Sequence, residues 1–506
     1  MVSIAEPPCY NHIINGQDTP PKENAYIDVI CPATGKIIAL TADGDARDVD
    51  LAVEAASTAF KNKDWRFMAP EQRSKLLYQL GNTVLANAQE LAQLEVEASG
   101  GTIKRVMGLD MLAIADLFFT LAESIKDYPF IENLAPKLLP EQVNTMVVRE
   151  AVGVCGVITA WNFPLLLLAW KIAPALAAGN TVVVKASELT PTSTYRVIEL
   201  FNTLLPPGVL NLVSGTGVKV GDALVRHPKV NKISFTGSTR TGKQIQTAAA
   251  ETLKRVTLEL GGKGAAIVMP DANLELVAHG ALFGIMMNAG QACESASRLI
   301  VHEDIHDELV AKMTEAAEKI AVGNPFDPNT GMGPIISEQQ FNKIIAYIDS
   351  AREQGAKIVC GGERRHVAGC ENGYFVAPTI ITECRNDMTH ACEEIFGPVL
   401  SVLKYRDIDA AIDTANDSVY GLSAGIWTED VVEAQAIARR LEAGSVWIND
   451  WHMMRTDAPF GGMKQSGYGR EMSELSLNSY TEIKAISTAF ERDPRKKSTY
   501  QLVHSF

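Results

Sequence analysis

The chain has 506 residues, with 46 Lys and Arg against 60 Asp and Glu, and a formal net charge of −14 at pH 7. Such an acidic balance argues against the nucleic-acid backbone and anionic membrane surfaces as partners. The length exceeds what one hydrophobic core usually serves, so we expect two or three domains.

The eight cysteines contain no CxxC pair, which is typical of a reduced, cytoplasmic protein without a zinc ribbon. Four of them lie between residues 360 and 392, but only two histidines are near, so we expect no metal site. The N-terminus lacks a basic region followed by an apolar one, and we expect no signal peptide. Residues 151–170 carry no charge, yet they include glycines, Asn162 and Pro164. We interpret them as a buried strand, a turn and the start of a helix rather than a membrane span.

The first half of the chain changes from irregular sequence to regular alternation. Residues 1–45 are irregular, with short β-like runs such as 25–29, and helical periodicity follows at 46–55, 76–85 and 106–125. Strands are then expected at 144–150, 152–160, 181–185, 209–213 and 232–236, with helices starting at Pro164 and spanning 193–204. Strands alternating with helices at this spacing predict a doubly wound α/β domain.

The same alternation restarts after Gly262 and predicts a second α/β domain. Its expected strands are 265–268, 298–301, 357–359 and 399–403, and its long helices are 304–322 and 337–354. Residues 475–489 are expected to form an exposed strand, followed by a charged segment and a tail that ends at Phe506.

Two glycine-rich turns are candidates for nucleotide binding. Gly215, Gly217 and Gly221 follow a predicted strand, but the gap between Gly217 and Gly221 is one residue longer than in the usual dinucleotide fingerprint. The stretch 237–243 fits a phosphate loop until Gln244 replaces the Ser or Thr that binds magnesium, which leaves a P-loop phosphotransferase as the weaker alternative. Gly237 and Ser238 lie between a strand and a helix, where free amides suit a pyrophosphate, although an ordinary turn would look the same.

A candidate nucleophile lies in the stretch 288–298, where Cys293 is surrounded by small residues and Gly290 adds conformational freedom. A cysteine alone would more often be core. A second stretch, 257–263, offers the carboxylate Glu259 at a predicted strand end, and a nucleophile with a base is the pattern of covalent catalysis. The alternative is that Glu259 ties down Lys263 or the strand end.

Seven stretches, in this order, resemble the aldehyde dehydrogenase superfamily along nearly the whole chain. They are Ala160-Trp-Asn-Phe-Pro164, Lys185-Ala-Ser-Glu188, Phe235-Thr-Gly-Ser-Thr239, Leu258-Glu-Leu-Gly-Gly262, Gly290-Gln-Ala-Cys293, Glu393-Glu-Ile-Phe-Gly-Pro398 and Pro459-Phe-Gly-Gly-x-Lys-x-Ser-Gly467. Ala186 departs from the family, which usually has proline there. A structural or binding protein with the same fold is less favoured, because nucleophile, base and oxyanion donor are all present.

The resemblance implies an NAD-dependent enzyme that makes free carboxylic acids, the hydrolytic branch of the family rather than the branch that acylates coenzyme A. Cys293 would attack the aldehyde, while the Asn162 amide and the Cys293 N–H would hold the oxyanion. After hydride transfer to NAD, Glu259 would activate the water that hydrolyses the thioester.

The resemblance also implies a set of cofactor residues. They are Trp161, Lys185, Glu188, Gly217, Gly221, Gly237, Ser238, Leu260, Glu394 and Phe396. Because the Glu188 carboxylate would repel a 2′-phosphate, NAD is favoured and NADP is possible but less favoured.

Around the substrate mouth the resemblance implies Leu167, Trp170, Met454 and Phe460, a lining that suits a medium aliphatic or aromatic aldehyde. Two charged residues complicate this expectation. Glu294 would attract a cationic substrate such as betaine aldehyde, and Arg455 the carboxylate of a semialdehyde. We expect both side chains to face away or to be solvated.

The fold implied by the resemblance has two doubly wound α/β domains and a small β flap for oligomerisation. The NAD-binding domain would comprise 1–127 and 149–261, the catalytic domain 262–463, and the oligomerisation element 128–148 and 479–506, with 464–478 as a return segment. The flap strands would leave open edges in a monomer, so we expect a homodimer or homotetramer.

Overall fold

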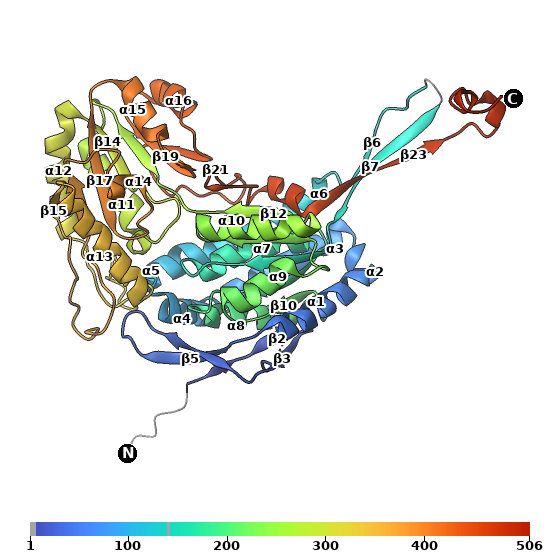
Figure 1. Cartoon of the computed structure of the whole chain (residues 1–506), viewed down its shortest axis with the longest axis horizontal. Helices are drawn as coiled ribbons and strands as arrows, with labels where there is room; N and C mark the ends of the chain where they lie inside the picture. The colour runs from blue at the N-terminus through green and yellow to red at the C-terminus, as the bar shows by residue number, and fades with distance from the viewer. Residues whose placement is uncertain (1–6, 139–141, 506) are drawn as a thin grey trace, which may run out of the picture.

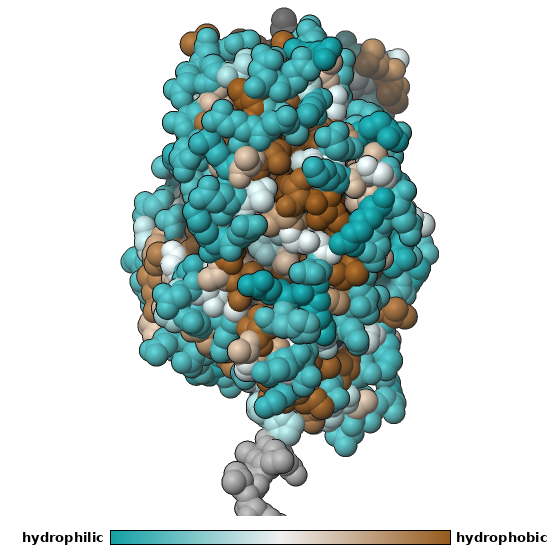
Figure 2. Space-filling view, turned by 90° about the vertical axis from the view of Figure 1, so that its left-hand side faces the viewer, coloured by the Kyte–Doolittle hydropathy of each residue, from teal (hydrophilic) through white to brown (hydrophobic). Residues whose placement is uncertain are grey.

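The computed structural model describes residues 7–138 and 142–505. Two α/β bodies lie next to each other, and a narrow β arm projects from one of them with the C-terminus near its tip (Figure 1). Hydrophilic residues cover most of the face shown in Figure 2, and hydrophobic ones form small patches between them.

The N-terminal region forms small strands and then helices. The strands are β1 (Cys9–Tyr10), β2 (His12–Ile14), β3 (Gln17–Thr19), β4 (Tyr26–Ile30) and β5 (Ile37–Ala42). The helices are α1 (Ala46–Lys61), α2 (Lys63–Arg66), α3 (Pro70–Ala86), α4 (Ala88–Ser99), α5 (Ile103–Arg105) and α6 (Met111–Asp127). Asp45 and Asp48 form a capping box that starts α1. The helix predicted from 106 is confirmed from Met111, but Val106–Asp110 form a π-helical turn.

The first body contains an eight-stranded sheet of order β22-β12-β11-β8-β9-β10-β2-β3. Its parallel strands are β8 (Val154–Ile158), β9 (Thr181–Lys185), β10 (Leu210–Leu212), β11 (Lys232–Thr236) and β12 (Arg255–Glu259), and the short β22 (Gly467–Tyr468) pairs antiparallel to β12. Helices α7 (Pro164–Ala177), α8 (Pro191–Asn202), α9 (Asp222–Arg226) and α10 (Thr239–Ala249) connect them. The buried run 181–185 is therefore an interior parallel strand, as predicted.

The second body contains a seven-stranded sheet of order β15-β16-β17-β14-β13-β19-β20. These strands are β13 (Ala265–Val268), β14 (Arg298–His302), β15 (Lys357–Cys360), β16 (Thr379–Thr382), β17 (Val399–Tyr405), β19 (Ser423–Trp427) and β20 (Ser445–Ile448). The helices are α11 (Leu274–Met286), α12 (Glu303–Glu318), α13 (Glu338–Glu353), α14 (Thr389–Cys392), α15 (Ile408–Asn416) and α16 (Val431–Ala438), and β18 (Tyr420–Gly421) pairs with β21 (Met463–Lys464). The predicted fold class, two α/β bodies with parallel sheets, is confirmed.

The projecting arm is an antiparallel sheet of order β23-β7-β6, formed by β6 (Ile131–Asn133), β7 (Val143–Ala151) and β23 (Thr481–Ala489) (Figure 1). The strand predicted for 475–489 is wrong in its first part, where Glu474–Tyr480 form a 3₁₀ helix. Leu477 and Tyr480 are buried in the first body, and this packing bends the chain before β23 begins.

Residues 151–170, the uncharged stretch, form β8 and the first half of α7, both buried in the first body. Their interpretation as strand, turn and helix is confirmed. Across the described part of the chain, no helix combines the length and apolar character needed to cross a membrane.

Candidate active site

The proposed nucleophile lies on a strained turn after α11. Asn288 and Ala289 have φ angles of 52° and 54°, and Gly290 has a φ of 69°. A Cβ on Gly290 would come within 2.0 Å of the Gly397 carbonyl oxygen, so only glycine lets the turn pack there. This turn places the half-buried Cys293 where the two bodies face each other.

Glu259 ends β12 and is buried at 2% exposure, and neither of its carboxylate oxygens has a hydrogen-bond partner in the described structure. Burial, and then the nearby charge of Glu471, raise the pKa of Glu259 to about 8. Lys263 does not hold this carboxylate, because its ammonium donates to the His390 carbonyl at 2.7 Å. The alternative that Glu259 ties down Lys263 is therefore wrong.

Asn162 lies in the loop between β8 and α7 and is buried at 4% exposure. Its amide nitrogen donates to the Gln291 carbonyl at 3.0 Å, and Asn288 in turn donates to the Asn162 carbonyl at 2.9 Å. These two bonds join the loop of Asn162 to the turn that carries Cys293. Among the described residues the second amide hydrogen of Asn162 has no acceptor, which leaves it for a substrate oxygen.

One cavity of about 210 Å³ brings together all three catalytic candidates and six of the ten cofactor candidates. Its lining includes Trp161, Asn162, Gly237, Ser238, Glu259, Leu260, Cys293, Glu394 and Phe396. The carboxyl ends of β11 and β12 open onto it, which is where open α/β sheets bind ligands.

Two lining residues lie outside the seven family stretches and were not expected from the sequence. Gln340 and Lys343 are three residues apart on α13, and they bond to the carbonyls of Phe396 at 2.9 Å and Glu394 at 3.3 Å respectively. Both belong to an otherwise ordinary amphipathic helix, and no sequence motif marks them.

A hydrogen bond and a ring contact hold the nicotinamide-side candidates, Glu394 and Phe396, in place. The Glu394 carboxylate accepts from the Gly262 N–H at 3.1 Å, and burial raises its pKa. The Phe396 ring meets the Trp161 ring edge to face at 5.3 Å. The Glu394 carboxylate and both rings belong to residues that line the cavity.

The adenosine-side candidates lie at the ends of β9 and β11. Lys185 and Glu188 form an ion pair at 2.7 Å, with the Lys185 side chain 5% and the Glu188 side chain 32% exposed. Ser238 is the N-cap of α10 and accepts from the Thr241 N–H at 3.2 Å. Gly217 and Gly221 begin and end a π-helical turn, and they do not line the 210 Å³ cavity.

The apolar candidates for the substrate mouth pack together. The Trp170 and Phe460 rings are 5.2 Å apart, Leu167 is buried, and Met454 packs against the cores of both bodies. None of the four lines the 210 Å³ cavity, and their place around the substrate mouth stays a prediction.

The two charged candidates differ. Arg455 is exposed and pairs with Asp457 at 2.7 Å, as expected for a solvated side chain. Glu294 is 5% exposed, and its carboxylate bonds His452 at 2.9 Å and the Cys293 thiol at 3.2 Å. The expectation that Glu294 faces away or is solvated is wrong, because a histidine from a distant loop satisfies the buried charge.

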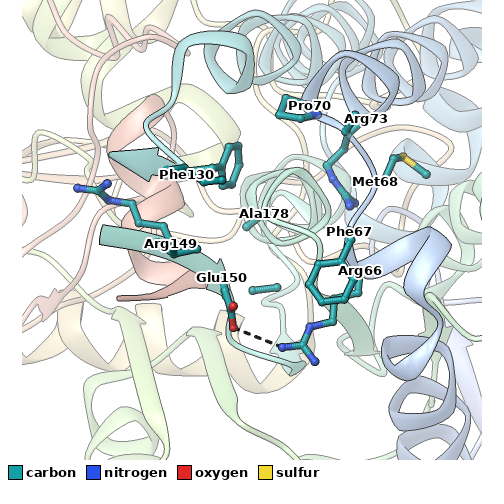
Figure 3. A pocket seen from close by; sticks show the side chains of 13 residues that line it. Arg66, Phe67, Met68, Pro70, Arg73, Phe130, Arg149, Glu150 and Ala178 are labelled. Atoms are coloured by element: carbon teal, nitrogen blue, oxygen red, sulfur yellow. Dashed lines mark hydrogen bonds and ion pairs between the residues drawn. The ribbon is translucent and has the colours of Figure 1, made fainter. Parts of the chain in front are cut away.

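A separate hollow of about 240 Å³ lies at the root of the arm (Figure 3). It is lined by residues of α2, α3, β6 and β7, and the Arg66–Glu150 ion pair at 3.5 Å spans one side of it. None of the predicted site residues lines this hollow. Within the described residues, no cluster of three or more His, Cys, Asp or Glu side chains could hold a metal ion.

A cysteine, an unpaired buried carboxylate and an asparagine amide around one cavity define an acyl-transfer class of site. The sequence model of the aldehyde dehydrogenase family matches residues 19–486. The chain belongs to the aldehyde dehydrogenase family, and the resemblance found in the sequence is confirmed. Membership of this family removes the P-loop phosphotransferase alternative.

Individual relatives match over almost their full length. Rat mitochondrial aldehyde dehydrogenase is 40% identical over 497 residues, which are 97% of this chain and 93% of the relative. Betaine aldehyde dehydrogenase of Bacillus subtilis is 40% identical over 474 residues, 94% of this chain and 96% of the relative.

Solved structures agree with these relatives. A betaine aldehyde dehydrogenase of Staphylococcus aureus in complex with NAD⁺ has a TM-score of 0.93 and 38% identity, and the match covers 96% of each chain. An indole-3-acetaldehyde dehydrogenase complexed with NAD⁺ has a TM-score of 0.92 and 39% identity, and the match covers 95% of this chain and 96% of the other.

Proposed function

We propose that this protein oxidises an aldehyde to the free carboxylic acid with NAD⁺ as the hydride acceptor. The observation that carries the proposal is the single cavity lined by Cys293, Glu259 and Asn162 together with Glu394 and Phe396. Relatives with the same fold were crystallised with NAD⁺, which supports the choice of cofactor.

Cys293 and Asn162 carry out the first steps of the proposed reaction. The Cys293 sulfur attacks the aldehyde carbon, and the negative oxygen that forms accepts hydrogen bonds from the Asn162 amide and the Cys293 N–H. Glu394 and Phe396 would hold the nicotinamide end of NAD⁺, which would accept the hydride, so that a thioester would remain on Cys293. The Gln291 bond to Asn162 holds the amide beside the nucleophile turn, so little reorganisation is needed when charge develops.

Glu259 suits the hydrolytic step because its carboxylate is buried, has no hydrogen-bond partner in the described structure and has a pKa raised to about 8. A base with a pKa near the working pH takes a proton from water efficiently. Water is therefore the proposed acyl acceptor, and coenzyme A is not required.

The Lys185–Glu188 pair supports NAD over NADP. Glu188 is partly exposed, so its carboxylate can accept hydrogen bonds from ribose hydroxyls, and it would repel a 2′-phosphate. Ser238 at the start of α10 presents the backbone amides of a helix N-terminus to the pyrophosphate.

An uncharged medium aliphatic or aromatic aldehyde is the proposed substrate. His452 already binds Glu294 and Asp457 already binds Arg455, so neither charged candidate is free to select a betaine or a semialdehyde. We expect a higher kcat/KM for hexanal or benzaldehyde than for betaine aldehyde or succinic semialdehyde. The opposite order would refute this choice.

We also propose that the protein is a cytoplasmic homodimer or homotetramer with the domain limits given by the sequence. The arm carries exposed apolar side chains, including Ile131 at 63% and Ile483 at 70% exposure. A second subunit would cover them and the open edge of β23. Sedimentation equilibrium tests this, and a monomer at micromolar concentration would contradict it.

The overall proposal is tested by mixing the protein with NAD⁺ and a panel of aldehydes and following NADH absorbance. We expect continuous turnover without coenzyme A. Absence of NADH with every aldehyde would refute the proposed function.

A further inference from the structure

A buried chain of three side chains links the nucleophile to a histidine. The Cys293 thiol donates to one carboxylate oxygen of Glu294 at 3.2 Å, and the other oxygen is 2.9 Å from Nδ1 of His452. The side chains of Glu294 and His452 are only 7% and 3% exposed. Since an ionised carboxylate can only accept hydrogen bonds, His452 donates through Nδ1.

The surrounding structure holds this chain in place. The Glu294 carbonyl accepts from the Trp451 indole at 2.8 Å and from the Ser423 hydroxyl at 2.9 Å. His452 adopts a φ of 57°, in the left-handed region, and its ring packs edge to face on Phe283 at 5.3 Å. Such a backbone conformation is costly for a non-glycine residue and persists only where the surroundings impose it.

We propose that Glu294, oriented by His452, takes the proton from the Cys293 thiol as the sulfur attacks the aldehyde, so that Glu259 acts only on the hydrolytic water. This assigns a second catalytic base to the proposed reaction and rests on the proposed function. Glu294 is a catalytic residue because its carboxylate touches the reacting thiol, whereas His452 is a positioning residue.

The proton balance closes over one cycle. The S–H bond of Cys293 breaks and the proton moves to Glu294 as the S–C bond forms. After hydride transfer, Glu259 takes a proton from water, the new C–O bond forms, and the S–C bond breaks to release a thiolate. The thiolate recovers its proton from Glu294, and Glu259 and the product acid release theirs to solvent.

The charged groups around the nucleophile favour Glu294 as the base for the Cys293 thiol and Glu259 as the base for water. Burial, and then the charges of Glu259 and Glu294, raise the pKa of the Cys293 thiol well above its usual value, so the resting thiol needs a base. Burial, and then the charge of Glu471, raise the pKa of Glu259 to about 8, so its carboxyl group is mostly protonated at neutral pH. Burial tends to raise the pKa of Glu294, but the hydrogen bond and charge of His452 hold it below its usual value. Glu294 is therefore the carboxylate that is charged and ready at neutral pH.

The first test is the rate of the NADH burst when the enzyme–NAD⁺ complex is mixed rapidly with an aldehyde. Glu294→Gln should slow the burst at pH 7 about a hundredfold, the scale of general-base catalysis. The burst phase should then no longer be resolved from steady turnover. Glu259→Gln should keep a fast burst. Glu95→Gln, which removes another buried carboxylate, is the matched control and should leave the burst unchanged. A Glu294→Gln burst within twofold of wild type would overturn the proposal.

The second test is alkylation of Cys293 by iodoacetamide, which needs neither aldehyde nor turnover and so separates this proposal from the proposed function. Loss of the proton acceptor in Glu294→Gln should slow alkylation at pH 7 about tenfold or more, while Glu294→Asp should recover much of the rate. If Glu294 were only a nearby negative charge, its removal would lower the thiol pKa and speed alkylation. Faster alkylation would overturn the proposal even if the burst were slow.

His452 is tested by the pH profile of the burst. Without the Nδ1 donor, the pKa of Glu294 rises, so His452→Phe should lose burst rate as pH falls from 7 to 5, while wild type stays flat. His452→Gln retains a donor and should restore the flat profile. A uniform loss at every pH in His452→Phe would show a merely structural role and overturn the positioning assignment.

Discussion

The pH dependence of steady turnover is the sharpest consequence of the Glu259 environment. A base acts only when deprotonated, and a pKa of about 8 leaves Glu259 about one-tenth ionised at pH 7 and about nine-tenths ionised at pH 9. If hydrolysis limits turnover, kcat should rise about tenfold between these values and level off above pH 9.

Changing the neighbours of Glu259 should move this inflection in a known direction. Glu471 is the next cause of the raised pKa after burial, and it pairs with the buried Lys171. Glu471→Gln removes a negative charge and frees a positive one, and both changes favour the ionised form of Glu259. The inflection should therefore shift to lower pH.

The assay is NADH production from pH 6 to 10 at saturating NAD⁺ and hexanal, with the burst measured separately. Glu259→Gln should give a burst of up to one NADH per competent site, then steady turnover slowed about a hundredfold or more. The inflection should be absent in this variant. A flat wild-type profile, the same inflection in Glu259→Gln, or turnover that stalls until coenzyme A is added would refute the reasoning.

Three further predictions address other parts of the molecule. Cys293→Ala should abolish oxidation while NAD⁺ binding by calorimetry and the oligomeric state are kept, and full activity would contradict the assignment. Asn162→Ala should lower kcat about a hundredfold or more, or roughly 3 kcal/mol, because one oxyanion donor is lost; a changed KM with unchanged kcat would argue against that role. Burial raises the pKa of Glu95 to about 7, so the folded state favours the protonated carboxyl group. The free energy of unfolding of the wild type therefore falls as pH rises from about 4.5, and the loss is complete above about 7. Glu95→Gln should therefore gain stability over wild type across this range, on the order of 3 kcal/mol at most, and a urea-unfolding difference that did not change with pH would exclude this cause.

The sequence alone predicted the features that depend on local pattern. The apolar run Thr181–Lys185 predicted an interior strand because both faces of a parallel strand are buried. Glu259 at a strand end and Gly290 before the nucleophile were also visible, since each follows from its neighbours in the chain. The alternation of strands and helices predicted the two α/β bodies, and the order of the family motifs predicted the family.

Only the tertiary structure decided the features that depend on contacts between segments far apart in the chain. Glu474–Tyr480, the first part of a predicted strand, form a 3₁₀ helix because Leu477 and Tyr480 are buried. Gln340 and Lys343 join the cavity because α13 packs beside Phe396, a contact that no local pattern encodes. The sequence predicted that Glu294 is solvated, whereas in the structure its carboxylate bonds to His452, 158 residues away in the chain. Burial of a charge depends on which partner the fold brings to it, and that partner cannot be inferred from the residues next to it in sequence.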